Sequence, residues 1–254
     1  MSFAVPAESY DRFMGRYSVQ LAAPFADFAG VEPGQSVLDV GCGPGALTGE
    51  LVTRLGAEAV SAVDPSEPFV AAARERHPGV DVRLASADEL PHQDDAFDAA
   101  LAQLVVHFMP DPVAGLRELA RVTRPGGTVG ACVWDHAGER SPLTVFWRAA
   151  HDVDGPTAID EAHLPGAREG HLQELLTAAG TTGIEATELT SRCEYETFEE
   201  YWAPYELGIG PAGGYVAKLD DEKRMAIRER CRELLGPAPF AIDAVAWAAL
   251  GRPA

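Results

Sequence analysis

Short apolar runs alternate with longer stretches of helical periodicity along the first half of the chain. The runs are bounded by glycine, proline or aspartate, which predicts strands over 36–40, 58–63, 80–85, 97–106 and 128–134. Between them, the spacing of apolar and alanine residues predicts helices over 46–55, 67–76 and from Asp111-Pro112 to Arg124-Pro125. Ser66 is expected to cap the second of these helices. Strands that alternate with helices indicate a parallel sheet covered on both faces.

The rhythm loosens after residue 135. The remaining pattern predicts helices around 143–151 and 168–179, a strand over 184–195, helices over 197–207 and 220–235, and a last strand over 239–250. A glycine-rich link at 208–214 is expected to join the last two helices. The long interruptions after the fifth and sixth strands exceed the usual length of a connection, and long connections are often lids over a functional site.

The most informative chemical pattern is the glycine-rich segment from Val37 to Gly45, between the first strand and the first helix. Glycines there let the backbone turn tightly and approach a ligand closely, and the following helix points free amide groups at the loop. Asp64 ends the second strand, where a carboxylate can accept hydrogen bonds from a ribose diol. Together they predict a site for an adenine nucleoside cofactor. The loop alone also fits the dinucleotide pattern, so it leaves that alternative open.

Further motifs follow the later strands. Ala87-Asp88-Glu89-Leu90-Pro91 comes just after the third strand, where the Asp88 carboxylate can accept a hydrogen bond from an adenine amine or can simply cap a short turn. Phe97-Asp98 leads into the fourth strand, and the segment from Arg121 to Gly127 precedes the fifth.

In this order and spacing, the chain resembles the class I S-adenosylmethionine (SAM) dependent methyltransferases, most closely the small-molecule branch similar to ubiquinone/menaquinone C-methyltransferase-like proteins. The segments that carry the resemblance are Leu38 to Gly45, Val63 to Ser66, Ala87 to Pro91, Phe97-Asp98 and Arg121 to Gly127. Tyr10 to Ser18, Phe198 to Trp202 and Gly208 to Pro211 are similar to uncharacterised bacterial members, so the resemblance covers the whole chain.

The resemblance implies an α/β fold with a Rossmann-like doubly wound sheet of seven strands in the order 3-2-1-4-5-7-6, with strand seven antiparallel. It implies one domain over 1–254, with helical inserts after strands five and six. Its expected parts are an N-terminal cap 1–29, a cofactor core of about 30–135, and acceptor-cover inserts of about 136–168 and 196–236. SAM would lie across the carboxyl ends of strands one, two and four.

The resemblance also assigns cofactor contacts to residues in these motifs, namely Asp39, Gly41, Gly43, Asp64, Pro65, Ala87, Asp88 and Gln103. The two glycines would line the methionine portion, and Asp39 would reach its amino group through water. Asp64 would bind the ribose and Asp88 the adenine, while Gln103 would face the methionine end. Two alternatives stay open: Asp39 only caps the glycine turn, and Gln103 is an ordinary polar residue at the end of a sheet.

Three residues near the N-terminus are further candidates for cofactor contact. The rings of Tyr10 and Tyr17 could stabilise a sulfonium, and Arg16 could bind the methionine carboxylate. The alternative is an amphipathic packing helix, because Tyr10, Phe13, Met14 and Tyr17 recur at helical spacing.

Methyl transfer requires alignment and exclusion of water more than a dedicated acid or base. His107, after the fourth strand, is the candidate catalytic base if the acceptor must lose a proton, and the alternative is a packing histidine. The aromatic residues Phe198, Tyr201, Trp202 and Tyr205 recur at helical spacing, which is more typical of a core than of a pocket wall.

Charge and composition narrow the partners. The 254 residues include 39 acidic and 20 basic side chains, for a formal net charge of -19. This disfavours nucleic acid and anionic membranes, which require a basic face, and favours a small-molecule acceptor. No apolar run approaches the roughly 18 residues of a membrane span, and Met1 to Ala7 have no signal-peptide pattern. The oligomeric state is not predicted.

The cysteines and histidines predict no metal site. Four cysteines lie far apart without a Cys-x-x-Cys pair, which is typical of reduced thiols and predicts a cytoplasmic protein. The seven histidines form no His-x-His or His-Glu-x-x-His pattern.

Three other functions are alternatives to the methylation of a small molecule. An NAD-dependent oxidoreductase would share the glycine loop and Asp64, but it leaves Asp88 and Arg121 to Gly127 unexplained, and the chain has no Tyr-x-x-x-Lys. A SAM-binding protein without catalysis would keep the same cofactor motifs. Methylation of nucleic acid is disfavoured by the charge and by Ala102-Gln103-Leu104-Val105, which stands where an Asn/Asp-Pro-Pro-Tyr/Phe motif would be expected.

Overall fold

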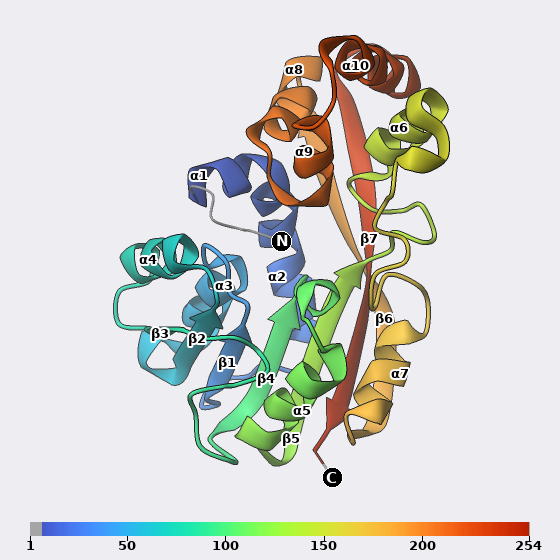
Figure 1. Cartoon of the computed structure of the whole chain (residues 1–254). Helices are drawn as coiled ribbons and strands as arrows, with labels where there is room; N and C mark the ends of the chain where they lie inside the picture. Colours follow the sequence, from blue (N-terminus) through green and yellow to red (C-terminus); the bar gives the residue numbers. More distant parts are fainter. Residues whose placement is uncertain (1–6, 254) are drawn as a thin grey trace.

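A computed structural model describes residues 7–253 of the chain (Figure 1). The predicted absence of a signal peptide and the first residues of the N-terminal cap 1–29 lie outside the described residues. The functional division of the chain into cap, core and inserts stays a prediction.

The fold is built on one sheet of seven strands in the order β3-β2-β1-β4-β5-β7-β6, as predicted. The strands are β1 Val37–Val40, β2 Val60–Asp64, β3 Asp81–Leu84, β4 Phe97–Gln103, β5 Thr123–Trp134, β6 Thr182–Tyr195 and β7 Phe240–Arg252. The first five pair in parallel, and β7 pairs antiparallel with both β5 and β6. All four residues of β1 are buried, as expected for a strand that is covered on both faces.

Helices cover both faces of this sheet (Figure 1). The helical segments of the first half are α1 Ala7–Tyr10, the π-helical turn η1 Asp11–Gly15, α2 Arg16–Phe28, α3 Ala46–Leu55, η2 Ala57–Ala59, α4 Glu67–Arg76, η3 Val106–Phe108 and α5 Pro112–Val122. Those of the second half are α6 Thr144–Asp154, η4 Gly155–Thr157, α7 His171–Ala178, α8 Phe198–Trp202, η5 Ala203–Leu207, α9 Gly210–Val216 and α10 Asp221–Leu235. Buried residues of α2 and α3 belong to one core cluster, and those of α5 and α7 belong to another on the opposite face.

The long strands β6 and β7 extend beyond the parallel strands and carry a second group of helices (Figure 1). We call α6 and α8 to α10 the cover. Its core is continuous with that of the sheet, because one cluster of buried residues includes both Val37 of β1 and Phe146 of α6. Within the cover, the ring of Phe146 stacks on Tyr205 in η5 at 4.5 Å between centroids. Within the described residues, no helix is both long enough and apolar enough to cross a membrane.

The fourth strand ends earlier than predicted, at Gln103 rather than at residue 106. Leu104 has a left-handed φ of 61°, and Val106 begins the short helix η3. Because Leu104 and Val106 are buried like the strand residues before them, the apolar pattern gives no signal where the backbone turns. Conversely, β5 begins at Thr123, before the predicted residue 128.

Two further local predictions were wrong. Residues 210–216 of the glycine-rich segment form helix α9 rather than a link, because Ala212 and Val216 are buried on its inner side. A Cβ on Gly213 would lie 2.7 Å from the carbonyl carbon of Gly208, so glycine permits the close approach of these two turns. Ser66 occupies the N-cap position of α4, but its side chain makes no capping hydrogen bond.

Candidate functional site

The glycine loop leaves the carboxyl end of β1 and enters α3. Gly41 has a φ of 73°, and a Cβ on it would lie 2.5 Å from a methyl carbon of Val105, so this position excludes other side chains. Gly43 has a φ of 54°, and a Cβ on it would meet nothing within 4 Å. The loop is therefore closed on the Val105 side and open at Gly43, where a ligand can approach its backbone.

Asp64 ties the glycine loop to the end of β2. Its side chain is 6% exposed, and its two carboxylate oxygens accept hydrogen bonds from the amides of Gly43 at 2.9 Å and Ser66 at 2.8 Å. Burial raises the pKa of Asp64, while these two amide hydrogen bonds oppose the shift. The structure thus adds a loop-organising role to Asp64; its predicted contact with ribose stays a prediction.

Asp39 lies at the same end of the sheet and is 1% exposed. Its Oδ2 accepts a hydrogen bond from the Thr48 hydroxyl at 2.7 Å, whereas its Oδ1 is buried without a partner among the described residues. Burial raises the pKa of Asp39 to about 7, and the nearby Asp64 adds to the shift. An unpartnered buried oxygen requires a donor, which fits the predicted contact with an amino group through water.

The structure brings four of the predicted cofactor residues into one pocket, which we call the loop pocket. It is lined by Gly41, Pro65, Ala85, Ser86, Ala87, Asp88, Val105, Phe108, Met109 and Pro110. These residues come from the loops that follow β1, β2, β3 and β4. The exposed carboxylate of Asp88 is held by the Ser86 hydroxyl.

A second pocket, the apolar pocket, adjoins the loop pocket, because Phe108 lines both. Its lining residues are Tyr10, Phe13, Met14, Leu104, His107, Phe108, Trp134, His136, Leu143, Glu161, Ile209, Gly210, Pro211 and Ala212. They come from the N-terminal helices, the ends of β4 and β5, the segment around α6 and the start of α9. Three parts of the chain that are remote in sequence therefore close over one space.

His107 lies in the apolar pocket at 6% exposure. Its ring centroid is 3.9 Å from that of Phe108 and 6.1 Å from that of His136, and its Nδ1 is buried without a hydrogen-bond partner among the described residues. Burial, reinforced by His136, lowers the pKa of His107 well below its usual value. The ring is therefore neutral near pH 7. Its catalytic role stays a prediction.

Tyr10 and Gln103 each join the N-terminal helices to another element. Tyr10 is half-buried in the apolar pocket, edge-on to Phe69 at 5.3 Å between centroids, and burial raises its pKa to about 12. Gln103 is 8% exposed and donates from Nε2 to the Ser18 carbonyl at 3.0 Å, while its Oε1 has no partner among the described residues. Gln103 thus joins β4 to α2 and keeps one buried acceptor unused.

Arg16 and Tyr17 line neither the loop pocket nor the apolar pocket. The Arg16 guanidinium donates to the Glu194 carbonyl at 2.7 Å and stacks over the Tyr195 ring at 4.1 Å. The Tyr17 hydroxyl lies 2.7 Å from the Tyr195 hydroxyl, and Tyr17 is 1% exposed. Both side chains attach α2 to β6, as the packing interpretation predicts. These contacts do not support the predicted contact of Arg16 and Tyr17 with the cofactor.

Two residues of the apolar pocket carried no recognisable sequence signal. Glu161 is 3% exposed, and its Oε2 accepts a hydrogen bond from the Trp147 indole nitrogen at 2.9 Å. His136 is 8% exposed. Both lie in the irregular segment after β5, where the only hint was its unusual length. By contrast, the aromatic residues predicted as core are all buried: Phe198, Tyr201, Trp202 and Tyr205.

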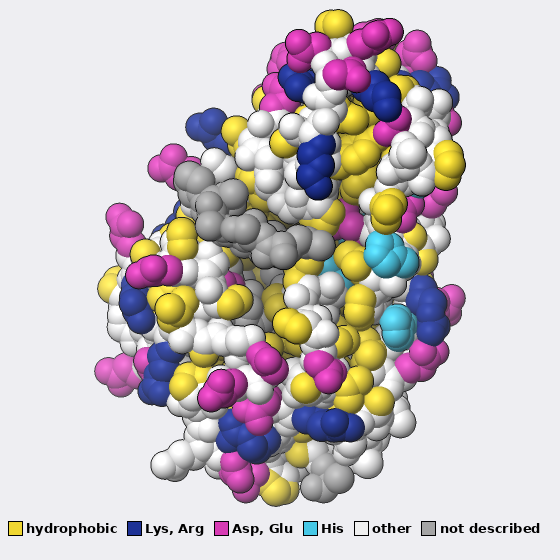
Figure 2. Space-filling model, viewed as in Figure 1, with side chains coloured by type: hydrophobic (Ala, Val, Ile, Leu, Met, Phe, Trp, Pro, Cys, Tyr) yellow, Lys and Arg dark blue, Asp and Glu magenta, His cyan; other side chains and the backbone are white. Residues whose placement is uncertain are grey.

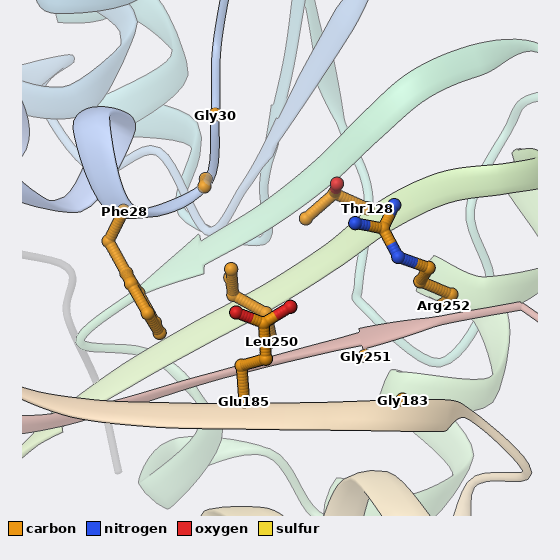
Figure 3. Close-up of a pocket in the computed structure, with 9 residues that line it drawn as sticks. Phe28, Gly30, Thr128, Gly183, Glu185, Leu250, Gly251 and Arg252 are labelled. Atoms are coloured by element: carbon orange, nitrogen blue, oxygen red, sulfur yellow. The ribbon is translucent and has the colours of Figure 1, made fainter.

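A third pocket lies at the opposite end of the sheet (Figure 3). It is lined by Phe28, Ala29, Gly30, Thr128, Gly183, Glu185, Leu250, Gly251 and Arg252. None of the predicted site residues belongs to it, and it faces away from the carboxyl ends of the parallel strands, where a doubly wound sheet binds ligands. Among residues 7–253, no group of three or more His, Cys, Asp or Glu side chains is placed to hold a metal ion.

Comparison with known proteins identifies a family match and several relatives. Residues 38–130 match the family described as "Methyltransferase domain". The chain is 31% identical over 204 residues to an uncharacterized protein of Mycobacterium bovis, a match that covers 76% of this chain and 74% of the relative. It is 41% identical over 102 residues to the ubiquinone biosynthesis O-methyltransferase of Xanthomonas campestris, which covers 38% of this chain and 42% of that protein.

Some relatives are much longer than the region they share. An uncharacterized 37.1 kDa protein in transposon TN4556 of Streptomyces fradiae is 37% identical over 115 residues, which cover 43% of this chain and 33% of the relative. Among solved structures, a Haloferax volcanii protein in complex with the Trm112 methyltransferase activator is 20% identical, with a TM-score of 0.61 over 97% of this chain and 94% of that chain. At this identity, the likeness shows the fold.

Proposed function

The chain belongs to the class I SAM-dependent methyltransferases, and on that premise we propose that it transfers the methyl group of SAM to a small-molecule acceptor. The observation that carries this proposal is the junction of the loop pocket and the apolar pocket at Phe108. The loop pocket is lined by the predicted adenosine contacts Pro65, Ala87 and Asp88, and the apolar pocket offers a separate space beside them. A methyltransferase that acts on a small molecule requires these two adjacent spaces.

The residues of the glycine loop fit the cofactor. Gly43 is open to solvent on its Cβ side, and Asp64 is buried with both oxygens turned toward backbone amides at the loop. We propose that Asp64 binds the ribose hydroxyls with Pro65 beside the sugar, and that Ala87 and Asp88 contact adenine in the loop pocket.

The methionine end of the cofactor would lie toward the centre of the sheet. We propose that Gly41 and Gly43 line it and that the free Oδ1 of Asp39 and the free Oε1 of Gln103 face it, because each of these buried oxygens lacks a partner among the described residues. Tyr10, in the apolar pocket, would lie on the side where the methyl group is transferred.

When bound, SAM supplies an activated methyl group together with its own leaving group. The protein then contributes mainly by holding the acceptor in line and by excluding water. Phe13, Met14, Leu104, Leu143 and Ile209 form an apolar lining that suits this task. His107 is the candidate to accept a proton from the acceptor; its lowered pKa makes the neutral imidazole available but weakens it as a base.

The walls of the apolar pocket come from the expected cap and inserts and also from the core, which contributes Leu104, His107, Phe108 and Trp134. The cap 1–29 contributes Tyr10, Phe13 and Met14, and the insert of about 136–168 contributes His136, Leu143 and Glu161. The insert of about 196–236 contributes Ile209 to Ala212. We therefore propose that these segments form the acceptor site, while the core of about 30–135 holds the cofactor.

The proposed small-molecule acceptor also agrees with the net charge of -19. The cytoplasmic location stays a prediction from the cysteines.

Isothermal titration calorimetry with SAM, S-adenosylhomocysteine and NAD tests the proposal. We expect the first two to bind and NAD to show no measurable binding. The variant Asp64→Asn should weaken SAM binding by about tenfold, which corresponds to the loss of a charged hydrogen bond. Asp94→Asn is the matched control, because Asp94 is exposed and pairs with Arg121. Tight NAD binding without SAM binding would refute the proposal.

A second measurement separates catalysis from binding alone. The protein is incubated with SAM and a broad set of hydroxyl, amine and thiol acceptors, and S-adenosylhomocysteine formation is quantified by mass spectrometry. Acceptor-dependent formation supports methyl transfer. Tight SAM binding without turnover on any acceptor would support the alternative of a SAM-binding protein that does not catalyse transfer.

A further inference from the structure

Glu161 is a buried carboxyl in the wall of the apolar pocket, at 3% exposure. Among the described residues its side chain accepts one hydrogen bond, from the Trp147 indole, and no arginine or lysine of residues 7–253 forms an ion pair with it. Burial raises the pKa of Glu161 to about 7, and the neighbouring Asp160 adds to the shift. A buried carboxyl without a cation is costly unless something else compensates its charge.

Glu161 and His136 stand between the apolar pocket and a further space, which we call the polar cavity. The polar cavity is lined by His136, Glu139, Ser141, Thr144, Trp147, Arg148, His151, Asp152, Asp160, Glu161 and Ala162. The shared residues make these two spaces adjacent, as Phe108 does for the loop pocket and the apolar pocket. A molecule in the apolar pocket therefore has Phe108 toward the cofactor side and Glu161 with His136 toward the polar cavity.

The groups around Glu161 offer hydrogen-bond acceptors but no compensating positive charge. Burial lowers the pKa of His136 to about 4, so its ring is neutral near pH 7, and its Nε2 is buried without a partner among the described residues. In the polar cavity, Arg148 is paired with Glu139 at 2.6 Å, and Asp152 is paired with Arg230 at 2.7 Å. Arg148 and Arg230 therefore already pair with carboxylates other than Glu161.

We propose that the methyl acceptor carries a basic nitrogen, and that Glu161 together with His136 binds this nitrogen at the wall that adjoins the polar cavity. This inference rests on the proposed function. A protonated amine supplies both the positive charge that the buried carboxylate lacks and the N–H donors that the carboxylate and the neutral imidazole can accept. An alcohol of the same shape would supply donors but leave the charge uncompensated. The atom to be methylated then lies toward Phe108.

The charge of the whole protein favours the same class of acceptor. The formal net charge is -19, and Figure 2 shows acidic side chains spread over the outer surface of the face in view. A negative field of this kind raises the local concentration of cations and repels anions. An acceptor with a carboxylate or phosphate in place of the amine would meet both this field and the buried Glu161.

The test is calorimetry on the full chain saturated with S-adenosylhomocysteine at pH 7.5. The probes are benzylamine, 2-phenylethylamine and 3-phenylpropylamine, each compared with the alcohol of the same length. We expect at least one amine to bind at least tenfold more tightly than its alcohol. The substitution Glu161→Gln keeps an acceptor for Trp147 but removes the charge, and it should reduce this preference to about twofold or less.

Asp160→Asn is the matched control, because Asp160 lines the polar cavity but not the apolar pocket. It should keep most of the preference for the amine. The proposal is overturned if no amine of the set binds, if the alcohols bind as tightly as the amines, or if Glu161→Gln retains the full preference. Loss of S-adenosylhomocysteine binding in the wild-type protein would instead count against the proposed function, so the two failures are distinguishable.

Proton release gives a second measurement on the unmodified protein, which is useful if Glu161→Gln does not fold. At pH 6.5 a large part of Glu161 is protonated, so binding of a protonated amine should expel a proton and make the calorimetric enthalpy depend on the buffer. The titratable and charged groups that line the two spaces beside Glu161 are Tyr10, His107, His136, Glu139, Arg148, His151, Asp152 and Asp160, and Tyr205 interacts with it as well. The imidazoles of His107 and His136 are already neutral and Tyr205 stays protonated at this pH, so these three release no proton. A buffer-independent enthalpy for a bound amine would contradict the proposal.

Discussion

Asp39 and Asp64 are two buried carboxyls that flank the glycine loop at the carboxyl ends of β1 and β2. Asp64 is stabilised by two backbone amides, whereas Asp39 has a single hydroxyl donor and one oxygen without a partner among the described residues. The two residues look equivalent in the sequence, but they differ in what the fold supplies to them. Of these two carboxyls, Asp39 is consequently the one whose charge the folded protein tolerates less in the absence of a ligand.

This difference predicts how stability changes with pH. The folded-state pKa of Asp39 is about 7, above its usual value of 3.8, so the folded protein binds its proton more tightly than the unfolded chain does. The resulting stabilisation is fully present below pH 4 and is lost as the pH rises from about 4 to 7. Asp39→Asn should therefore raise the free energy of unfolding at pH 8 by a few kcal/mol and change it little at pH 4. Urea denaturation at both pH values measures this. A variant destabilised at pH 8 would contradict it.

His107 gives a second prediction at the residue scale. Replacing His107 by Asn should abolish most of the turnover while leaving SAM affinity within about twofold, because the ring lines the apolar pocket and not the loop pocket. Steady-state kinetics and calorimetry on the same preparation measure the two effects. Unchanged turnover would remove His107 from the mechanism and leave it as a packing residue against Phe108.

At the scale of elements, the glycine-rich helix α9 shows how a segment that looks like a loop becomes part of a wall. Its N-cap residue Ile209 and its first residues, Gly210 to Ala212, line the apolar pocket, and the helix packs against the turn that contains Gly208. Glycine reduces helix propensity, so local preference favours a loop. Burial of Ile209, Ala212 and Val216 reverses that preference.

Two neighbouring glycines of α9 test this explanation. In Gly213→Ala the new Cβ would lie 2.7 Å from the Gly208 carbonyl carbon, so the helix must shift and the protein should lose about 1–3 kcal/mol of stability. In Gly214→Ala the Cβ meets nothing within 4 Å, and the higher helix propensity of alanine should stabilise the protein by about 0.5–1 kcal/mol. Thermal unfolding of both variants checks the contrast. Equal effects of the two substitutions would show that the close approach at Gly213 does not matter.

At the scale of the whole molecule, charge and packing act in opposite directions. The formal net charge of -19 produces self-repulsion in the compact state, and the exposed ion pairs contribute little individually. The continuous core from α2 and β1 through Phe146 to Tyr205 opposes this repulsion and joins the sheet to the cover. The cover is therefore held mainly by apolar contacts, which salt does not weaken.

A salt dependence follows from this balance. Raising the concentration of sodium chloride from about 0.02 to 0.3 M screens the self-repulsion more than it weakens local ion pairs, so the unfolding temperature should rise by a few degrees. Differential scanning calorimetry at pH 8 measures the shift. A fall in the unfolding temperature would mean that the ion pairs contribute more than the self-repulsion costs.

Much of the cofactor half could be predicted from the sequence. The Val37 to Gly45 loop and the placement of Asp64, Ala87 and Asp88 after consecutive strands depend on short-range patterns, and the resemblance correctly implied the order of the seven strands. Errors arose where the chain turns inside the core. The turn at Leu104 is buried, and there the apolar pattern no longer separates a strand from a turn. The helix α9 was missed because its glycines favour a loop, and burial of one side reverses that preference.

The alternation of strands and helices and the residues at the ends of the strands could be predicted from local patterns, because both depend on neighbours a few positions away, and the resemblance of these motifs pointed to the family. Which residues line the apolar pocket depends instead on the tertiary structure. It brought Tyr10, His107, Glu161 and Ile209 to one pocket and turned Arg16 and Tyr17 toward β6. Helical periodicity shows which side of a helix is buried, but it does not show which element packs on that side. That element depends on the long-range packing of the cover against the sheet.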